Sequence, residues 1–243
     1  MQHSRALPAV GCMPNPPVPE SRGFMYRILF EHPAFLVIDK QPGIGMHDEK
    51  GDGEAVNPGL VNRVKADTGL TLYPVHRLDK MTSGLVLLAR TTEANRELSM
   101  AFAAREVSKQ YLALSDRKPK KKQGWVKGDM QKGRGGSWML VRTLDNPAIS
   151  WFDSVSVREG LRLYRIKPQT GKTHQIRVAL KSIGAPILGD ERYGGTPADR
   201  GYLHAWRLSF TLAGDPFDFV CPPDVGSEFV TPELTAAIAA LAP

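Results

Sequence analysis

The chain has few cysteines, no long apolar run and no signal peptide. Its 243 residues include only two cysteines, Cys12 and Cys221. Two distant cysteines cannot build a structural zinc site or a disulfide framework, and they fit a reducing compartment. No apolar run approaches the roughly 18 residues that a membrane-spanning helix needs. The N-terminus lacks the basic start and apolar stretch of a signal peptide. We therefore expect a soluble cytoplasmic protein with no membrane partner.

Several common cofactor and nucleophile motifs are also missing. Gly171-Lys172-Thr173 ends like a phosphate-binding loop, but that motif needs a second glycine where this chain has Ile166. The six histidines show no metal-ligand spacing such as HExxH, and no Gly-x-Ser-x-Gly element is present. No glycine fingerprint for a dinucleotide follows an expected strand. The sequence therefore predicts no cofactor and no metal.

The chain does have an excess of positive charge. Its formal net charge is +7, while its 42% apolar and 23% charged residues are ordinary for a globular protein. A basic excess favours a polyanionic partner, and nucleic acid is the commonest one. A basic surface without any such role is an equally good interpretation of charge alone.

The pattern along the chain predicts an α+β fold. Residues 1–24 are proline-rich without a period and are predicted to be a disordered extension. Apolar runs of strand length alternate irregularly with a few helical patterns, which is typical of α+β proteins. The expected helices are 58–67, 92–105, 173–183 and one that begins near Thr231. We expect a catalytic domain over 25–220 and a C-terminal tail with a short helix over 221–243.

Two segments combine titratable groups with turns. In residues 75–84, VHRLDKMTSG, Asp79 lies between Arg77 and Lys80, whose charges favour an ionised carboxylate able to act as nucleophile or base. An Asp that caps a surface turn is the alternative. In residues 170–177, TGKTHQIR, a turn precedes a helix start that suits phosphate, and Arg177 could pair with a buried carboxylate. A solvated helix end is the alternative there.

A third segment, residues 117–134, has eight Lys or Arg residues against Asp129 alone, with Trp125 among them. Basic residues interleaved with an aromatic suit an RNA contact, with charge directed at phosphate and the ring at a base. We predict Lys120, Lys121 and Lys122 as a docking surface for RNA, with a mobile solvated loop as the alternative.

These segments resemble a known family. HRLDKMTSG followed by an apolar strand is similar to the signature of RluA-type pseudouridine synthases, which belong to the RluA/RsuA superfamily. Further segments in the same order resemble the other motifs of that family: KQPG with His47, KQY at 109–111, TGKTHQIRVAL at 170–180, IGAPILGDERYG at 183–194 and LHA at 203–205. The resemblance covers about residues 25–220.

The resemblance implies a bent, mainly antiparallel mixed sheet with flanking helices and a central catalytic cleft. It implies that uridines in ribosomal or transfer RNA are isomerised to pseudouridine without a cofactor. Asp79 matches the catalytic aspartate, Tyr111 the tyrosine that packs on the target base, and Arg177 the arginine that pairs with the aspartate. The expected substrate-binding residues are Arg77, which fills the space of the flipped nucleotide, Ile176, which lines the base pocket, and His76, Lys172, His174 and Gln175.

Two positions depart from the family pattern, since Ala179 stands where His is usual and Lys172 where Arg is commoner. The small RNA-binding domain of many relatives cannot be built from residues 1–24, which we expect to be dispensable, and we expect a monomer. Two rival functions remain open. A catalytically silent RNA-binding module would lack Asp79, Tyr111 or Arg177, and a carboxylate-based hydrolase would need a second carboxylate such as Asp190.

Overall fold

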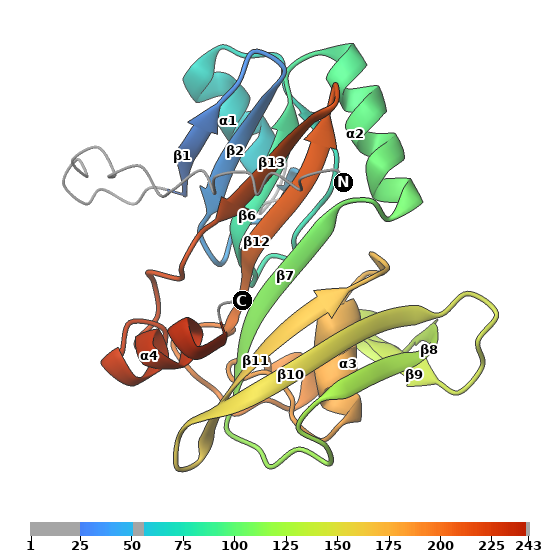
Figure 1. The fold of residues 1–243 in the computed structure, drawn as a ribbon, viewed down its shortest axis with the longest axis vertical. Helices are drawn as coiled ribbons and strands as arrows, with labels where there is room; N and C mark the ends of the chain where they lie inside the picture. Colours follow the sequence, from blue (N-terminus) through green and yellow to red (C-terminus); the bar gives the residue numbers. More distant parts are fainter. Residues whose placement is uncertain (1–24, 51–55, 242–243) are drawn as a thin grey trace, which may run out of the picture.

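The computed structural model describes residues 25–50 and 56–241, so the N-terminal extension predicted from the sequence lies outside the described residues. Nine strands follow one another across a long, bent mixed sheet (Figure 1). In spatial order they are β1 Tyr26–Glu31, β2 Phe35–Lys40, β6 Ser83–Ala89, β12 Leu203–Leu212, β7 Ser108–Ser115, β11 Leu161–Pro168, β10 Ala148–Arg158, β8 Gly124–Lys132 and β9 Trp138–Val141.

The sheet is mainly antiparallel, which confirms the α+β expectation. Of the pairings along this path, β6 with β12 is parallel and the others are antiparallel. Two further strands join this sheet: β13 Asp215–Val220 pairs with β12, and β5 Tyr73–Pro74 with β6. The strands β3 Glu49–Lys50 and β4 Val56–Asn57 form a separate two-stranded sheet.

Two hydrophobic cores fill the two halves of the molecule. In the upper half of Figure 1, the helices α1 Leu60–Thr68 and α2 Thr92–Ala104 flank the end of the sheet that contains β1, β2 and β6. In the lower half, α3 Gln175–Ser182 and α4 Pro232–Leu241 flank β7, β10 and β11. The strand β7 runs from one half to the other, and its Tyr111 packs against both cores.

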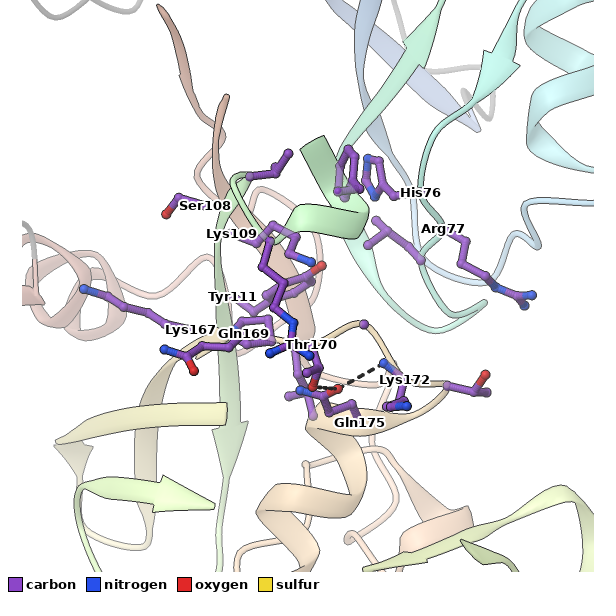
Figure 2. Close-up of a pocket in the computed structure, with 18 of the residues that line it drawn as sticks. His76, Arg77, Ser108, Lys109, Tyr111, Lys167, Gln169, Thr170, Lys172 and Gln175 are labelled. Carbon is purple, nitrogen blue, oxygen red and sulfur yellow. Dashed lines mark hydrogen bonds between the residues drawn. The ribbon is translucent and has the colours of Figure 1, made fainter. Parts of the chain in front are cut away.

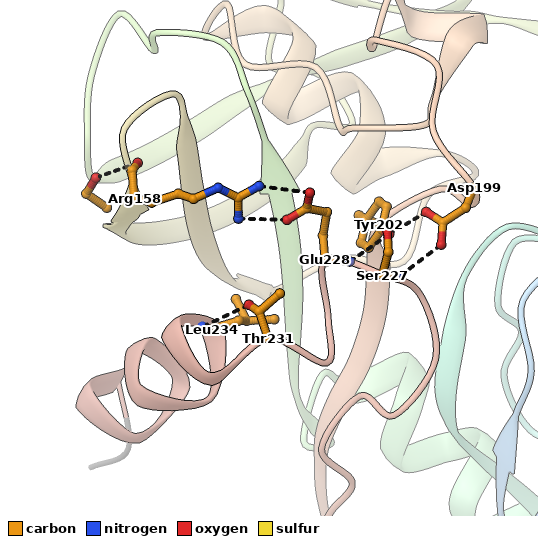
Figure 3. A network of polar contacts seen from close by, with 8 residues as sticks. Arg158, Asp199, Tyr202, Ser227, Glu228, Thr231 and Leu234 are labelled. Carbon is orange, nitrogen blue, oxygen red and sulfur yellow. Dashed lines mark hydrogen bonds and ion pairs between the residues drawn. The ribbon is translucent and has the colours of Figure 1, made fainter.

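The C-terminal segment is fastened to this sheet. The guanidinium of Arg158 forms an ion pair with Glu228 at 2.7 Å, and the backbone amide of Glu228 donates to the Tyr202 hydroxyl at 3.0 Å (Figure 3). The hydroxyl of Thr231 accepts from the backbone amide of Leu234 at 3.3 Å, which caps the start of α4. Leu234 is fully buried in the lower core, so α4 is packed against the sheet.

The basic segment at 117–134 contains a strand that the sequence did not predict: residues 124–132 form β8, between β10 and β9. In β8 the buried residues Val126 and Gly128 alternate with the exposed residues Trp125 and Lys127. The many lysines of the segment hid this strand pattern in the sequence. Among the described residues, no helix is long and apolar enough to cross a membrane.

Candidate active site

A cavity of about 1150 Å³ lies where the two halves meet. Its walls come from the loop before β6, the end of α2, β7, β10 and β11, and the turn that leads into α3. Figure 2 shows this arrangement, with Tyr111 near the centre, Arg77 on one side and Lys167 on the other. Asp79 and Ile176 also line the cavity, and Leu78 beside Asp79 belongs to the upper core.

A buried lysine, Lys40, bonds to the backbone of the loop that carries Asp79. Lys40 is fully buried, and its ammonium donates hydrogen bonds to backbone carbonyl oxygens of Gln41 and Ile44 at 2.8 Å and of Lys80 at 3.2 Å. Burial lowers the pKa of Lys40 to about 7. Because Lys80 follows Asp79 directly, this contact fixes the backbone next to the carboxylate.

A glycine lets the strand behind Asp79 approach its neighbour. Gly84 has φ of +101°, and a Cβ at this position would lie 2.3 Å from the backbone oxygen of Ala205. Only glycine tolerates both this backbone conformation and this contact. The glycine that ends the Thr-Ser-Gly segment therefore allows close packing of two strands. It lets β6 pair with β12 in parallel directly after the loop that carries Asp79.

Polar groups beneath this junction form a closed network. The guanidinium of Arg200 donates to the Ser83 hydroxyl at 2.7 Å, and Ser83 lies 2.8 Å from Nδ1 of His204. Nε2 of His204 lies 2.7 Å from the carbonyl oxygen of Cys221, so Nε2 donates and Nδ1 accepts from Ser83. Burial lowers the pKa of His204 to about 4, which keeps the ring neutral and the network fully bonded.

Arg177 contacts two carboxylates. Its Nε and Nη2 donate to Asp190 at 2.7 and 2.8 Å in a bidentate pair, and its Nη1 lies 3.6 Å from Oδ2 of Asp79. The exposed fractions of the side chains are 8% for Arg177, 1% for Asp190 and 17% for Asp79. Burial alone would lower the pKa of Arg177, but the bond to Asp190 and the two negative charges raise it. Arg177 is therefore a permanent cation beside Asp79.

Asp190 was the second carboxylate that the hydrolase alternative required. Both of its oxygens accept hydrogen bonds from Arg177, and its side chain is almost fully buried. A carboxylate in this position cannot reach a substrate that occupies the cavity. The geometry therefore disfavours a mechanism based on two carboxylates.

Tyr111 and His174 complete the wall around Asp79. Burial, followed by the charge of Asp79, raises the pKa of Tyr111, so the phenol stays neutral. The hydroxyl of Tyr193 accepts from the backbone amide of Trp138 at 2.9 Å and lies 2.8 Å from Nδ1 of His174. Burial lowers the pKa of His174, and its φ of 57° turns the backbone sharply into α3.

Of the other predicted substrate-binding residues, Gln175 uses its polar atoms inside the protein, whereas Lys172 lies on the exposed rim. The side chain of Gln175 has its hydrogen bonds inside the protein: its oxygen accepts from Thr170 and from the amide of Lys172, and its nitrogen donates to Ile149 and Ser150. Gln175 thus fixes the turn before α3. The ammonium of Lys172 donates to the Asn146 side chain at 2.6 Å on the exposed rim.

His76 and Arg77 both line the cavity but face different surroundings. Nε2 of His76 accepts from the backbone amide of Leu87 at 2.9 Å, and its ring stacks on Phe102 at 4.9 Å. Burial, followed by the charge of Lys109, lowers the pKa of His76 to about 3. Arg77 is exposed and extends toward the outer rim of the cavity (Figure 2).

The three lysines predicted to dock RNA do not line the cavity and lie beside different elements. Lys120 lies at the C-terminal end of α3, and the ammonium of Lys121 donates to the backbone oxygen of Trp125 on β8. The amide of Lys120 donates to the carbonyl oxygen of Ile183, at the C-terminal end of the helix, whereas Ile176 near its N-terminal end lines the cavity. Eight helical residues separate the two ends by about 12 Å. The cavity takes its basic side chains from Arg77, Arg105, Lys109, Lys167 and Lys172.

Sequence reasoning therefore missed Arg105, Lys109 and Lys167 as well as Trp151 in the wall, and Asp190 as the partner of Arg177. The apolar-polar alternation of β10 and β11 was the only signal that could have indicated Trp151 and Lys167. Within 25–50 and 56–241, no group of three His, Cys, Asp or Glu side chains could hold a metal ion.

Comparison with known proteins agrees with the geometry. Residues 34–182 match the family described as RNA pseudouridylate synthase. A relative from Haemophilus influenzae, named an uncharacterized RNA pseudouridine synthase, is 45% identical over 208 residues, which cover 84% of this chain and 91% of the relative. Ribosomal large subunit pseudouridine synthase D from Nitrosomonas europaea is 35% identical over 201 residues, which cover 76% of this chain and 58% of that protein.

Among solved structures, human RNA pseudouridylate synthase domain containing 1 superimposes with a TM-score of 0.70. The match covers 89% of this chain and 90% of the human chain at 21% identity, so it shows a shared fold. Human RNA pseudouridylate synthase domain containing 4 matches with a TM-score of 0.67 at 23% identity over 88% of this chain and 93% of that chain.

Proposed function

The chain belongs to the RNA pseudouridylate synthase family, and on that premise we propose that it isomerises uridines in structured ribosomal or transfer RNA with Asp79 as the nucleophile. The observation that carries the proposal is the position of Asp79, which is partly exposed in a large cavity and 3.6 Å from a buried arginine. This arrangement puts a cation beside the carboxylate and leaves the carboxylate open to a substrate.

The reaction is an internal rearrangement of the nucleotide. Asp79 attacks the target uridine, the bond between the base and the ribose breaks at nitrogen, and the base rotates. A bond from carbon of the base then joins it to the ribose, and the carboxylate is released. That carbon loses its proton, and the nitrogen that was bound to the ribose gains one, so the composition of the nucleotide is unchanged. The atoms of substrate and product are the same, so the step needs no oxidant, reductant or group carrier.

The surroundings of Asp79 fit this chemistry. Arg177 lies beside the carboxylate of Asp79 without covering both of its oxygens, because Asp190 already accepts the bidentate pair of the guanidinium. Tyr111, whose raised pKa keeps it a neutral phenol, offers a ring against which a base can pack. Ile176 adds an apolar wall beside them.

The cavity has to accept a nucleotide that has left its stack. An enzyme that acts on a base in structured RNA extrudes the target, at a cost of about a few kcal/mol. A volume of about 1150 Å³ accommodates an extruded nucleotide and parts of its neighbours. Arg77 is exposed at the rim, and we propose that it fills the gap that the nucleotide leaves.

The proposed substrate class follows from the names of relatives. The protein from Nitrosomonas europaea is named as acting on the large ribosomal subunit, and this chain spans 58% of it. Ribosomal RNA is therefore the first substrate to test, with transfer RNA second. We further propose that residues 25–220 hold the catalytic machinery and that the protein works in the cytoplasm as a monomer.

The test measures pseudouridine in ribosomal and transfer RNA that lack the modification, incubated with the pure protein and with Asp79→Asn. The parent should form pseudouridine at specific uridines, while the variant keeps RNA binding and loses turnover, because the change removes charge and preserves shape. Measurable turnover by Asp79→Asn would overturn the nucleophile assignment, and no product from the parent on either RNA would overturn the substrate class.

A further inference from the structure

Two tryptophans and a lysine form a row across three strands beside the catalytic cavity. Trp151 on β10 lies directly opposite Trp125 on β8 and directly opposite Lys167 on β11. Side chains in such register share one face of a sheet and lie about 5 Å apart. All three residues line the same cavity as Asp79.

This row faces away from the core. The neighbouring residues Val126, Phe152 and Ile166 are buried in the lower core together with α3. Because successive side chains of a strand point to opposite faces, Trp125 and Trp151 lie on the outer face. The exposed fraction of Trp125 is 43%, which is unusual for so large an apolar side chain.

Cations accompany both indole rings. The ammonium of Lys127 lies 5.1 Å from the centre of the Trp125 ring, and that of Lys167 lies 5.4 Å from the centre of the Trp151 ring. Asp153, the nearest acid along β10, is neutralised by Arg165 at 2.6 Å. The surface is therefore aromatic and positively charged, which suits bases and phosphates together.

We propose that Trp125 and Trp151 form a stacking platform for the unpaired nucleotides that flank the target uridine, with Lys127 and Lys167 contacting their phosphates. This inference rests on the proposed function and adds the part of the RNA that the protein contacts next to the target uridine, on another wall of the same cavity. The sequence predicted Lys120–Lys122 as the RNA-docking surface of the basic segment. The platform instead puts the principal RNA contact on β8 and the strands beside it.

The platform has an energetic reason. Extruding a nucleotide breaks its stacking with both neighbours. Rings that are already ordered in a sheet can replace that lost stacking at little cost in conformational entropy, since an indole has only two side-chain torsions. Because every base has an aromatic face, the platform should favour unpaired loops without demanding one sequence.

The experiment compares Trp125→Ala and Trp151→Ala with Trp138→Ala as a matched control. Trp138 also has a lysine over its ring, Lys132 at 5.9 Å, but it lies on β9 at the end of the sheet. The probes are an RNA hairpin with uridines in its loop and a blunt duplex of the same length. Binding is followed by electrophoretic shift and by quenching of tryptophan fluorescence.

Each platform variant should weaken hairpin binding by roughly tenfold, as alanine substitution at a stacking site does, and should leave duplex binding unchanged. KM should rise by a similar factor while the single-turnover rate at saturating RNA stays the same. Phe at either position should restore most of the affinity, and Trp138→Ala should bind like the parent. Thermal melts exclude unfolding as the cause.

Hairpin binding that is equal in the parent and both platform variants would overturn the platform. An equal loss of hairpin and duplex binding would also overturn it, since that result indicates charge without stacking. A parent that binds the hairpin through Trp125 and Trp151 but forms no pseudouridine in any RNA would leave the platform standing and refute the proposed activity. The two failures are therefore distinguishable.

Discussion

Arg177 directs its bidentate side to Asp190, and Asp79 receives only the looser contact at 3.6 Å. The sequence suggested a direct pair between Arg177 and Asp79. In the structure Asp190 holds the guanidinium in place. The positive charge of Arg177 therefore lies beside Asp79 without blocking its carboxylate oxygens. A nucleophile needs an accessible oxygen, and this three-residue arrangement leaves one.

Replacing Asp190 with Asn should impair both catalysis and stability. The change leaves Arg177 buried with one charged partner instead of two, and breaking a buried pair typically costs about 3–5 kcal/mol. The freed guanidinium would turn to Asp79 and cover the nucleophile, so kcat should fall more than the affinity for RNA. Chemical denaturation and single-turnover kinetics measure the two effects.

Asp218→Asn is the matched control, because Asp218 also accepts a bidentate arginine, Arg207, on the partly exposed strands β12 and β13, and neither residue lines the cavity. A surface pair of this kind contributes up to about 1 kcal/mol. Asp218→Asn should keep the parent's kcat. Equal kcat for Asp190→Asn and the parent would show that Arg177 does not depend on Asp190.

Gly84→Ala should be far more damaging than Gly69→Ala. Both glycines have positive φ, so alanine at either position costs about 1–2 kcal/mol of backbone strain. At Gly69 nothing lies within 4 Å of the new Cβ, whereas at Gly84 the backbone of Ala205 is in the way. The second variant must therefore separate β6 from β12 and displace the Asp79 loop.

Thermal melts and turnover assays of both variants test this difference. Gly69→Ala should melt a few degrees below the parent and keep its turnover, while Gly84→Ala should lose both stability and activity. Similar melting temperatures for the two variants would show that β6 and β12 can move apart without cost.

The sequence predicted the order and type of most elements because their apolar patterns are strong. Helix α2 was expected at 92–105 and spans Thr92–Ala104, and α3 was expected at 173–183 and spans Gln175–Ser182. Strand β8 was missed because its core-facing positions include Gly128, which carries no apolar signal, and its exposed positions carry lysine. Local pattern could not reveal which strands would become neighbours.

The sequence predicted only those site residues that lie in the family motifs. Asp79, Tyr111 and Arg177 are brought together as the resemblance implied, although 32 and 66 residues separate successive members of this set. The partnership of Arg177 with Asp190 and the row of Trp125, Trp151 and Lys167 depend on strand register and on the turn after α3. Those relationships arise from tertiary packing, which one sequence does not display.

Changing Lys120, Lys121 and Lys122 together to Ala tests whether the lysines that precede β8 contact RNA. If all three contact phosphate, the magnitude of the slope of log K against log salt should fall by roughly 0.7 to 0.9 for each contact. Single-turnover chemistry at saturating RNA should stay the same, because these lysines lie away from Asp79. A salt titration of binding measures the slope, and an unchanged slope would indicate a merely solvated surface.

The stability of the protein should fall in mild acid because the half-buried ring of His76 is held in its neutral form. Its pKa in the folded protein is about 3, against about 6.5 in the unfolded chain. Between these values the unfolded chain binds one more proton than the folded protein, so stability rises with pH and is lost as the pH falls below about 6.5. The loss from this residue should reach about 2 kcal/mol at pH 5.

His76→Gln isolates this contribution. The Gln side-chain oxygen can accept the backbone amide of Leu87 as Nε2 of His76 does, but it cannot be protonated in this range. The variant should therefore be less stable than the parent at pH 8, where lost stacking on Phe102 dominates, and should lose less stability on going from pH 8 to pH 5. Because Nε2 faces the backbone, RNA affinity at pH 8 should stay within about twofold of the parent, a difference of about 0.4 kcal/mol. Urea denaturation at the two pH values measures the difference, and parallel pH dependences of parent and variant would show that His76 has the same pKa in the folded protein as in the unfolded chain.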